Sequence, residues 1–154
     1  MLVALALGAC SSKTPQYPAD HERIRGIDQA VDALRDAYQG KNASGFRSLL
    51  QSADQLAQLQ RQVEDDFEAF HAISLEFKIE RVVIEGDDID VYIHWQGVWK
   101  KQADEAGVRQ RGHARLQWAG TGSILLRGVQ GDLPFGMKVK QALSDTPLSP
   151  PNPR

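Results

Sequence analysis

Hydrophobic residues change their spacing once along the chain, from a helical period to a strand period. Up to about residue 72 they recur every three or four positions, which places them on one face of a helix. This pattern predicts a helix from Ile24 to Tyr38, a short helix after a cap at Asn42, and a third helix from Ala53 to Ala72. From Ile73 apolar and polar residues alternate, and this period of two predicts strands.

Turn signals divide the second half of the chain into four strands, which we expect to form an antiparallel meander. The turns lie at Gly86-Asp87, 104–107 and 120–122. The first turn would place Ile84 opposite Ile89, and an extra residue near Glu80, a β-bulge, would restore the alternation and bend the strand. The third turn would pair Trp118 with Ile124.

The second turn fixes the predicted register of the two central strands. A four-residue loop at 104–107 would pair Trp95 with Leu116. It would also place His94 and His113 four residues apart along the strands, roughly 13 Å at ~3.3 Å per residue. That separation is too large for a shared metal ion, and we expect no metal or other cofactor.

Together these elements predict an α+β domain in which three N-terminal helices pack on a bent four-stranded antiparallel sheet. The inward positions of the strands are almost wholly apolar. The third helix carries four acidic residues that we expect on its solvated surface, namely Glu64, Asp65, Asp66 and Glu68.

The chain opens with an apolar run that ends at Cys10, its only cysteine. The string Leu7-Gly8-Ala9-Cys10 resembles the lipobox of bacterial lipoproteins. The resemblance implies that residues 1–9 are a signal peptide and that Cys10 carries the lipid. Secretory signals open with a basic residue, and none precedes Cys10, so we expect the leader to begin further upstream. Ser11, where an Asp would retain the protein, is similar to lipoproteins sent to the outer membrane.

Composition indicates one globular domain behind this leader. The chain is 25% charged and 42% hydrophobic with a net charge of −2, which gives no case for nucleic-acid binding. No later stretch approaches the ~18–20 apolar residues that span a bilayer, so membrane attachment would come through Cys10. We expect residues 10–20 to form a flexible tether, 21–140 the domain, and 141–154 a disordered tail rich in proline.

The order of elements resembles the nuclear transport factor 2-like superfamily, including its polyketide-cyclase-like branch. The resemblance rests on residues 37–42 (A-Y-Q-G-K-N), followed by Phe46 and Leu49-Leu50, and it covers roughly residues 22–136. It implies a cone-shaped sheet that curls around the long helix. That superfamily contains isomerases, dehydratases and cyclases as well as non-catalytic binding and scaffold domains, so the fold alone does not settle the function.

Two groups of residues are candidate sites. Aromatic side chains would line an apolar pocket inside the cone that could hold a small apolar ligand, and this candidate pocket comprises Tyr38, Phe77, Trp95 and Trp118. Core packing is the plainer interpretation of the same residues. The basic outward face is most simply a solvated surface, and the alternative is that it binds a second copy or an envelope protein, because Tyr and Arg are enriched at interfaces. This candidate interface comprises Tyr92, Arg111, His113, Arg115 and Arg127.

These observations predict a membrane-anchored envelope lipoprotein, facing the periplasm, that acts as a non-catalytic binding or assembly module. The alternative is a small enzyme of the isomerase or dehydratase type. The resemblance would give such an enzyme an Asp and a Tyr inside the cone, and the residues that match are Tyr38 and Asp132. A polar cavity containing both side chains would favour the enzyme, whereas an interior filled by aromatic residues would count against it.

Overall fold

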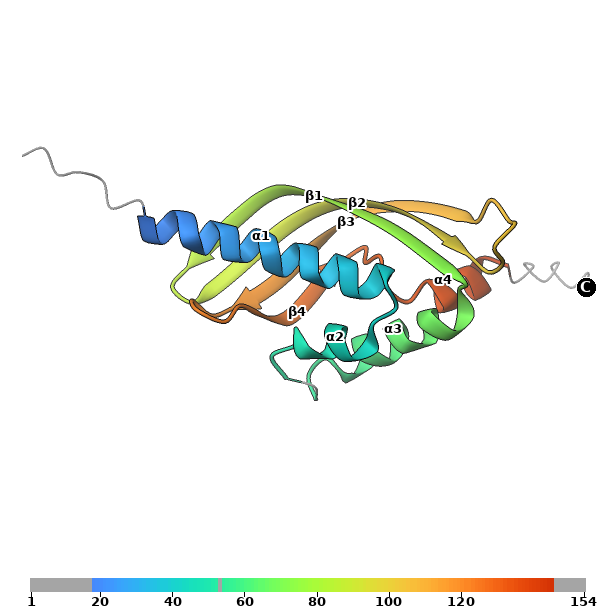
Figure 1. The fold of residues 1–154 in the computed structure, drawn as a ribbon, viewed down its shortest axis with the longest axis horizontal. Coiled ribbons are helices and arrows are strands. Elements are labelled where there is room, and N and C mark those ends of the chain that lie inside the picture. The colour runs from blue at the N-terminus through green and yellow to red at the C-terminus, as the bar shows by residue number, and fades with distance from the viewer. Residues whose placement is uncertain (1–17, 53, 146–154) are drawn as a thin grey trace, which may run out of the picture.

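The computed structural model describes residues 18–52 and 54–145. Helices and strands follow in the order α1 (Pro18–Gln39), α2 (Ala43–Ser48), α3 (Ala57–Ala69), β1 (Ala72–Glu85), β2 (Asp88–Lys100), β3 (Val108–Ala119), β4 (Leu125–Gly131) and α4 (Met137–Ser144). The predicted α+β class is confirmed, and the short helix α4 is added after the sheet (Figure 1). Cys10 and the rest of the predicted leader lie outside the described residues.

The four strands form one antiparallel sheet in the order β1-β2-β3-β4, so the predicted meander is confirmed. Ile84 pairs with Ile89, as the turn at the first hairpin predicts. The pairing then shifts between Ile79 and Arg81, which leaves Glu80 as the extra residue of the predicted β-bulge. Because a bulge increases local bend and twist, the long strand β1 curves over the helices (Figure 1).

The predicted register of the β2–β3 hairpin was wrong by four residues. Trp95 pairs with Gly112 instead of Leu116, and His94 lies directly opposite His113. The rings of the two histidines are stacked with their centroids 4.8 Å apart, where the prediction separated them by roughly 13 Å.

This error has a physical cause in the loop. The connection runs over 101–107, because the Glu105 carboxylate accepts a hydrogen bond from the backbone N–H of Lys101 and closes a turn there. A shift of four residues leaves every side chain on its original face, so the alternation could not detect it. The last hairpin also differs from the prediction: Trp118 pairs with Leu126, two residues beyond the predicted Ile124, and the pairing shifts again between Gln117 and Trp118.

Two of the predicted helices have different bounds. α1 begins at Pro18, inside the segment predicted as a tether, and its Ile24, placed on the buried face, is 47% exposed. α3 is shorter than predicted and runs from Ala57 to Ala69. α4 continues to Ser144, four residues into the segment predicted as a tail.

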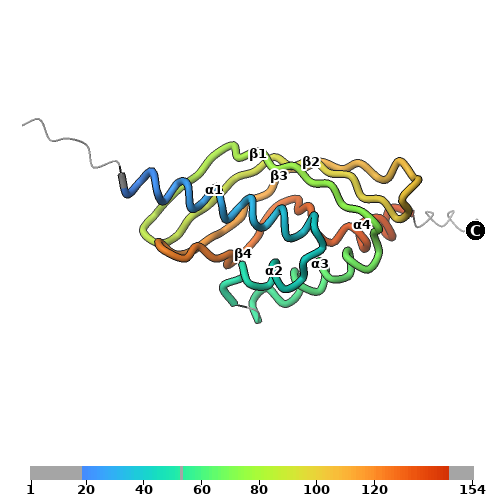
Figure 2. Tube along the Cα trace, in the orientation of Figure 1, coloured from blue at the N-terminus to red at the C-terminus, as the bar shows by residue number. Residues whose placement is uncertain are grey.

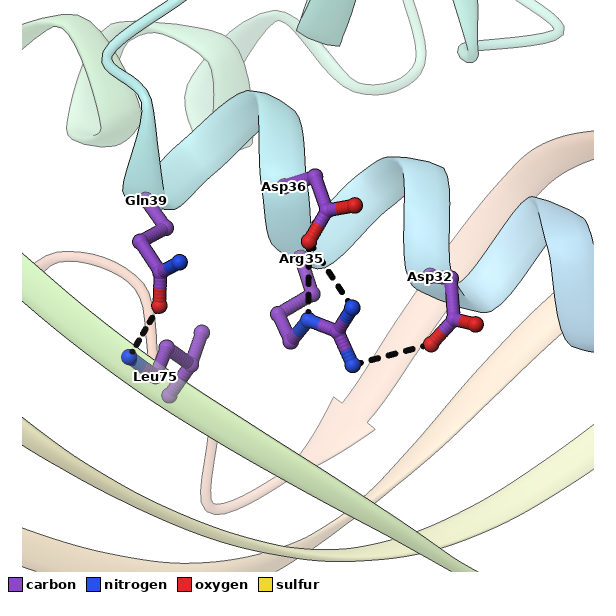
Figure 3. Close-up of polar contacts among 5 residues, drawn as sticks. All are labelled: Asp32, Arg35, Asp36, Gln39 and Leu75. Atoms are coloured by element: carbon purple, nitrogen blue, oxygen red, sulfur yellow. Dashed lines mark hydrogen bonds and ion pairs between the residues drawn. The ribbon is translucent and has the colours of Figure 1, made fainter.

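The helices lie on the inner face of the sheet, and each sheet edge makes a hydrogen-bonded contact with the helical part of the chain. Gln39 at the end of α1 accepts a hydrogen bond from the backbone N–H of Leu75 on edge strand β1, at 2.9 Å (Figure 3). The same view shows Arg35 of α1 paired with Asp32 and Asp36. At the other edge, the segment after α2 pairs with Leu126 of β4.

The two ends of the described chain lie at opposite ends of the molecule (Figure 2). The start of α1 lies beside the β1–β2 turn, where Arg23 donates a hydrogen bond to the carbonyl oxygen of Gly86 at 2.6 Å. α4 lies beside α3 at the other end. Within the described ranges, no helix combines the length and the apolar character needed to cross a bilayer.

Candidate functional site

The inner face of the sheet is filled by aromatic side chains. Three residues of the candidate pocket are almost without exposed surface, with Tyr38 and Trp118 at 0% and Trp95 at 2%. The fourth, Phe77, is partly buried and packs against the same core. Phe135 closes over Tyr38 with ring centroids 4.9 Å apart and nearly perpendicular planes. The predicted pocket residues are therefore part of the hydrophobic core.

The Tyr38 hydroxyl, the polar group that points into this core, belongs to a buried hydrogen-bond network. It donates to Asp66 Oδ2 at 2.7 Å and accepts from Trp99 Nε1 at 2.9 Å. Asp66 Oδ2 also accepts from the backbone N–H of Gly136 at 2.7 Å, and Oδ1 accepts from the backbone N–H of Lys138 at 2.8 Å. The carboxylate thus joins α3 to α1 and to the start of α4, and β2 is connected to it through the Tyr38 hydroxyl.

Burial raises the pKa of Tyr38 well above 10, and the charge of Asp66 raises it further. The phenol therefore stays protonated at neutral pH. Asp66 has no exposed surface and uses both oxygens as hydrogen-bond acceptors. A general acid or base must reach a proton on the substrate, and these two groups are occupied by the protein itself.

Asp66 corrects the prediction that the acidic residues of the third helix all face solvent. Its spacing from Leu59 and Val63, seven and three residues, places it on the buried helical face. That spacing could have identified it, because an acidic residue in an apolar stripe must be compensated by hydrogen bonds or an opposite charge. The Tyr38 hydroxyl therefore has a partner that sequence reasoning missed.

The second residue of the enzyme alternative, Asp132, lies elsewhere. Its side chain is 62% exposed and forms an ion pair with Lys140 at 3.6 Å. Its backbone carbonyl accepts a hydrogen bond from Trp95 Nε1 at 2.6 Å, which fixes the end of β4 against β2. Tyr38 is fully buried in its own network, so the structure does not place the two side chains in one polar cavity.

A small cavity of about 140 Å³ opens beside Asp132, between the sheet and α4. Trp95 forms one wall and Gln141 of α4 another. Gln141 is 8% exposed, and its Nε2 is buried without a hydrogen-bond partner among the described residues. Gly112 leaves room here, since a Cβ at this position would lie 2.4 Å from Asp132 Oδ2.

The outer face of the sheet brings part of the candidate interface together. Tyr92 pairs with Arg115 across β2 and β3, and both line a shallow hollow with His113. The guanidinium of Arg81 stacks on the Tyr92 ring at 4.0 Å, a cation–π contact. Arg115 is ion-paired with Asp90.

The two remaining residues of the candidate interface lie apart from this group. Arg127 pairs with Asp88 at 2.6 Å near the first turn. Arg111 lines a different hollow on β3. Over residues 18–52 and 54–145, no three His, Cys, Asp or Glu side chains gather as metal ligands would.

Sequence comparisons find no match to a family model and none to a curated protein. Structure comparison does find neighbours. A candidate dehydratase of the nuclear transport factor 2-like family from Streptomyces avermitilis superposes with a TM-score of 0.63 at 13% identity, covering 72% of this chain and 96% of that one. A nuclear transport factor 2-like superfamily protein from Salmonella enterica gives 0.64 at 10% identity, covering 75% and 93%.

A hexachlorocyclohexane dehydrochlorinase (LinA, type 2) gives a TM-score of 0.61 at 7% identity, covering 75% of this chain and 88% of that one. At such identities the likeness concerns the fold and leaves activity open. Neighbours from separate proteins nevertheless agree over the helices and the bent sheet. The described part of the chain therefore has the nuclear transport factor 2-like fold.

Proposed function

We propose that this protein is a lipid-anchored module of the bacterial envelope that acts by binding and not by catalysis. The observation that carries the non-catalytic part is the Tyr38–Asp66 pair. Both groups are buried, and each is fully engaged in hydrogen bonds within the protein. Because neither group can reach a substrate, an enzyme that uses Tyr38 is disfavoured, and this supports a binding role for the domain.

The lipobox sequence at Leu7–Cys10 supports the anchored part of the proposal. Seven residues lie between Cys10 and Pro18, and the eight steps from one to the other span at most about 28 Å when extended. The start of α1 would thus stay close to the membrane. α4 lies at the opposite end of the molecule and would face the periplasm (Figure 1). The anchored domain would present its sheet to partners away from the bilayer.

The anchor is tested by fractionation of the full chain, expressed from its natural translation start in a two-membrane bacterium. The wild type should sediment with membranes, and its intact mass should show residues 1–9 removed and acyl chains added at Cys10. Cys10→Ser should leave the membrane fraction. A Ser11→Ala variant, which keeps the lipid-bearing thiol, is the matched control. Equal fractionation of wild type and Cys10→Ser would contradict the proposal.

The destination is tested by separating the inner and outer membranes on a density gradient. The residue after Cys10 is Ser, so we expect the protein with the outer membrane. Ser11→Asp should move it to the inner membrane, whereas Ser11→Ala should not. An unchanged distribution for Ser11→Asp would contradict sorting by this residue while leaving lipidation intact.

One observation favours the second candidate, a small enzyme of the isomerase or dehydratase type. The exposed Asp132 carboxylate and the unpartnered Gln141 amide flank the same cavity beside Trp95. An exposed carboxylate next to a hydrogen-bond donor could abstract a proton beside a carbonyl group. Exchange of such protons with D₂O, followed by NMR over a panel of small ketones and hydroxy acids, tests it. Catalysed exchange that Asp132→Asn abolishes would favour the enzyme.

A further inference from the structure

A hollow of about 470 Å³ crosses the outer face of the sheet at the end remote from the first turn. It lies where β1 begins, β2 ends and β3 begins. Two cross-strand rows of outward side chains form it: Ser74, Val98 and Arg109 in one row, and Glu76, Gln96 and Arg111 in the other. The hollow therefore has a cationic side on β3 and an acidic residue on β1.

The two arginines on the cationic side are free. Arg109 and Arg111 are exposed, and neither guanidinium group makes a hydrogen bond or an ion pair with any described residue. By contrast, Arg115 and Arg127 on the same face are neutralised by aspartates. Residues i and i+2 of a strand point the same way about 7 Å apart, so the guanidinium groups can converge on one anionic group.

The acidic side is fixed in place. Glu76 Oε2 accepts a hydrogen bond from Gln96 Nε2 at 2.5 Å, while its Oε1 accepts none from the described residues. The carboxylate lies two strands from the arginines, and two strand spacings amount to about 10 Å between backbones. Because Arg and Glu side chains are long, their charged groups can lie closer together than the backbones do. A small ligand can therefore contact both sides at once, and a ligand with several negative charges would be repelled by Glu76.

The backbone of Gly97 forms part of the floor between the rows, and its side-chain position faces the inner side of the sheet, like those of Trp95 and Trp99. A Cβ there would lie 2.6 Å from the Trp99 ring and 2.9 Å from the backbone oxygen of Ser74. The indole of Trp99 thus packs directly behind the floor. Because this buried ring lies against the floor, its fluorescence is an indirect readout of occupancy, to be used beside calorimetry.

We propose that this hollow binds a small zwitterion, with its anionic group on Arg109 and Arg111 and its amino group on Glu76. Opposite charges on the two walls select for a ligand that carries both charges a few bonds apart. The inference deepens the proposed function by giving the binding module a ligand class. It stands apart from the anchor, since loss of binding would leave membrane fractionation unchanged.

The test uses two probes, O-phosphoethanolamine and inorganic phosphate, titrated against the full chain with fluorescence and calorimetry as readouts. Wild type should bind O-phosphoethanolamine saturably and more tightly than phosphate. Arg109→Ala and Arg111→Ala should each weaken both probes by about tenfold, the effect of losing one charge-assisted hydrogen bond. Arg127→Ala, on the same face but outside the hollow, is the matched control and should change neither.

Glu76→Gln gives the sharper result, because the two probes should respond in opposite directions. It should weaken O-phosphoethanolamine by about fivefold and strengthen phosphate by a similar factor, as expected for one nearby charge in water. Unfolding midpoints establish that each variant is folded. Absence of saturable binding, or changes of the same sign for both probes, would overturn the proposal.

Vesicles distinguish a free zwitterion from a lipid headgroup of the same chemistry. The hollow lies at the far end of β1 from the start of α1, which favours the free compound. Binding of O-phosphoethanolamine without sedimentation on phosphatidylethanolamine vesicles would support the free ligand. Sedimentation on these vesicles that Glu76→Gln reduces would assign the site to the lipid headgroup.

Discussion

Replacing Asp66 by Asn removes one negative charge from the core while keeping the shape of the side chain. The carboxylate accepts three hydrogen bonds, from the Tyr38 hydroxyl and from the backbone N–H groups of Gly136 and Lys138. An amide has one accepting oxygen and one donating nitrogen. The best arrangement keeps the oxygen toward Tyr38 and Gly136 and turns the NH₂ group toward the N–H of Lys138, where two donors then face each other.

The magnitude follows from these contacts. Losing a hydrogen bond to a charged group, with the donor left unsatisfied, costs about 2 kcal/mol. The two remaining bonds change from charge-assisted to neutral, and a carboxylate at the N-terminus of α4 no longer stabilises the helix dipole, which adds about 1 kcal/mol. We expect Asp66→Asn to lower the free energy of unfolding by about 3 kcal/mol. That is a large share of the ~5–15 kcal/mol typical of a domain.

Urea unfolding at pH 7, followed by tryptophan fluorescence, measures this loss. With a slope of about 2 kcal/mol per molar urea, the midpoint should fall by about 1.5 M. Asp65→Asn is the matched control: it is the neighbouring residue, is about half exposed and pairs with Lys138 at 3.4 Å, so it should cost less than about 0.5 kcal/mol. Equal midpoints for the two variants would refute the reasoning.

Three further predictions test other parts of the structure. Burial raises the pKa of Tyr38, so above pH 10 the phenol ionises in the unfolded state and not in the folded one. The wild type should therefore lose about 1.4 kcal/mol of stability per pH unit above pH 10. Unfolding measured between pH 9 and 11 should show this slope in the wild type and not in Tyr38→Phe. Asn42→Ala removes the side-chain cap of α2 and should cost about 1 kcal/mol in thermal unfolding, whereas Asn42→Asp should not. Gly97→Ala should cost about 2 kcal/mol because its methyl group meets the Trp99 ring, against no change for Gly122→Ala, which has open space.

Most of the architecture could be predicted from the sequence because it depends on which face each side chain occupies. The periods of 3.6 and 2 gave helices before a four-stranded meander, and the break in alternation gave the bulge at Glu80. The β2–β3 register failed because a shift of four residues preserves the face of every side chain, and the β3–β4 hairpin contains a further register shift between Gln117 and Trp118 that was not predicted. Register of that kind is set by loop contacts such as Glu105 to Lys101, which alternation does not record.

The sites were harder to predict for a related reason. Asp66 belonged to an acidic run, and only its position in the helical stripe distinguished it from its exposed neighbours. The pairing of His94 with His113, and the grouping of Arg109 and Arg111 with Glu76, both depend on the β2–β3 register. The register error of four residues displaced the charged side chains of β3 along β2 by about a third of the strand length. The prediction therefore had the right residues on the outer face and the wrong neighbours for each.

The buried network also limits where this domain can interact with other molecules. In the structure, Tyr38 and Asp66 join α1 and α3 to the sheet and to α4, and aromatic side chains fill the inner face around them. A ligand could enter this part of the core only by breaking those hydrogen bonds, at a cost of several kcal/mol. The outer face carries no such constraint, because its arginines project from strands that the core already holds rigid. Recognition on that face can therefore change by substitution at Arg109 or Arg111 without cost to the fold.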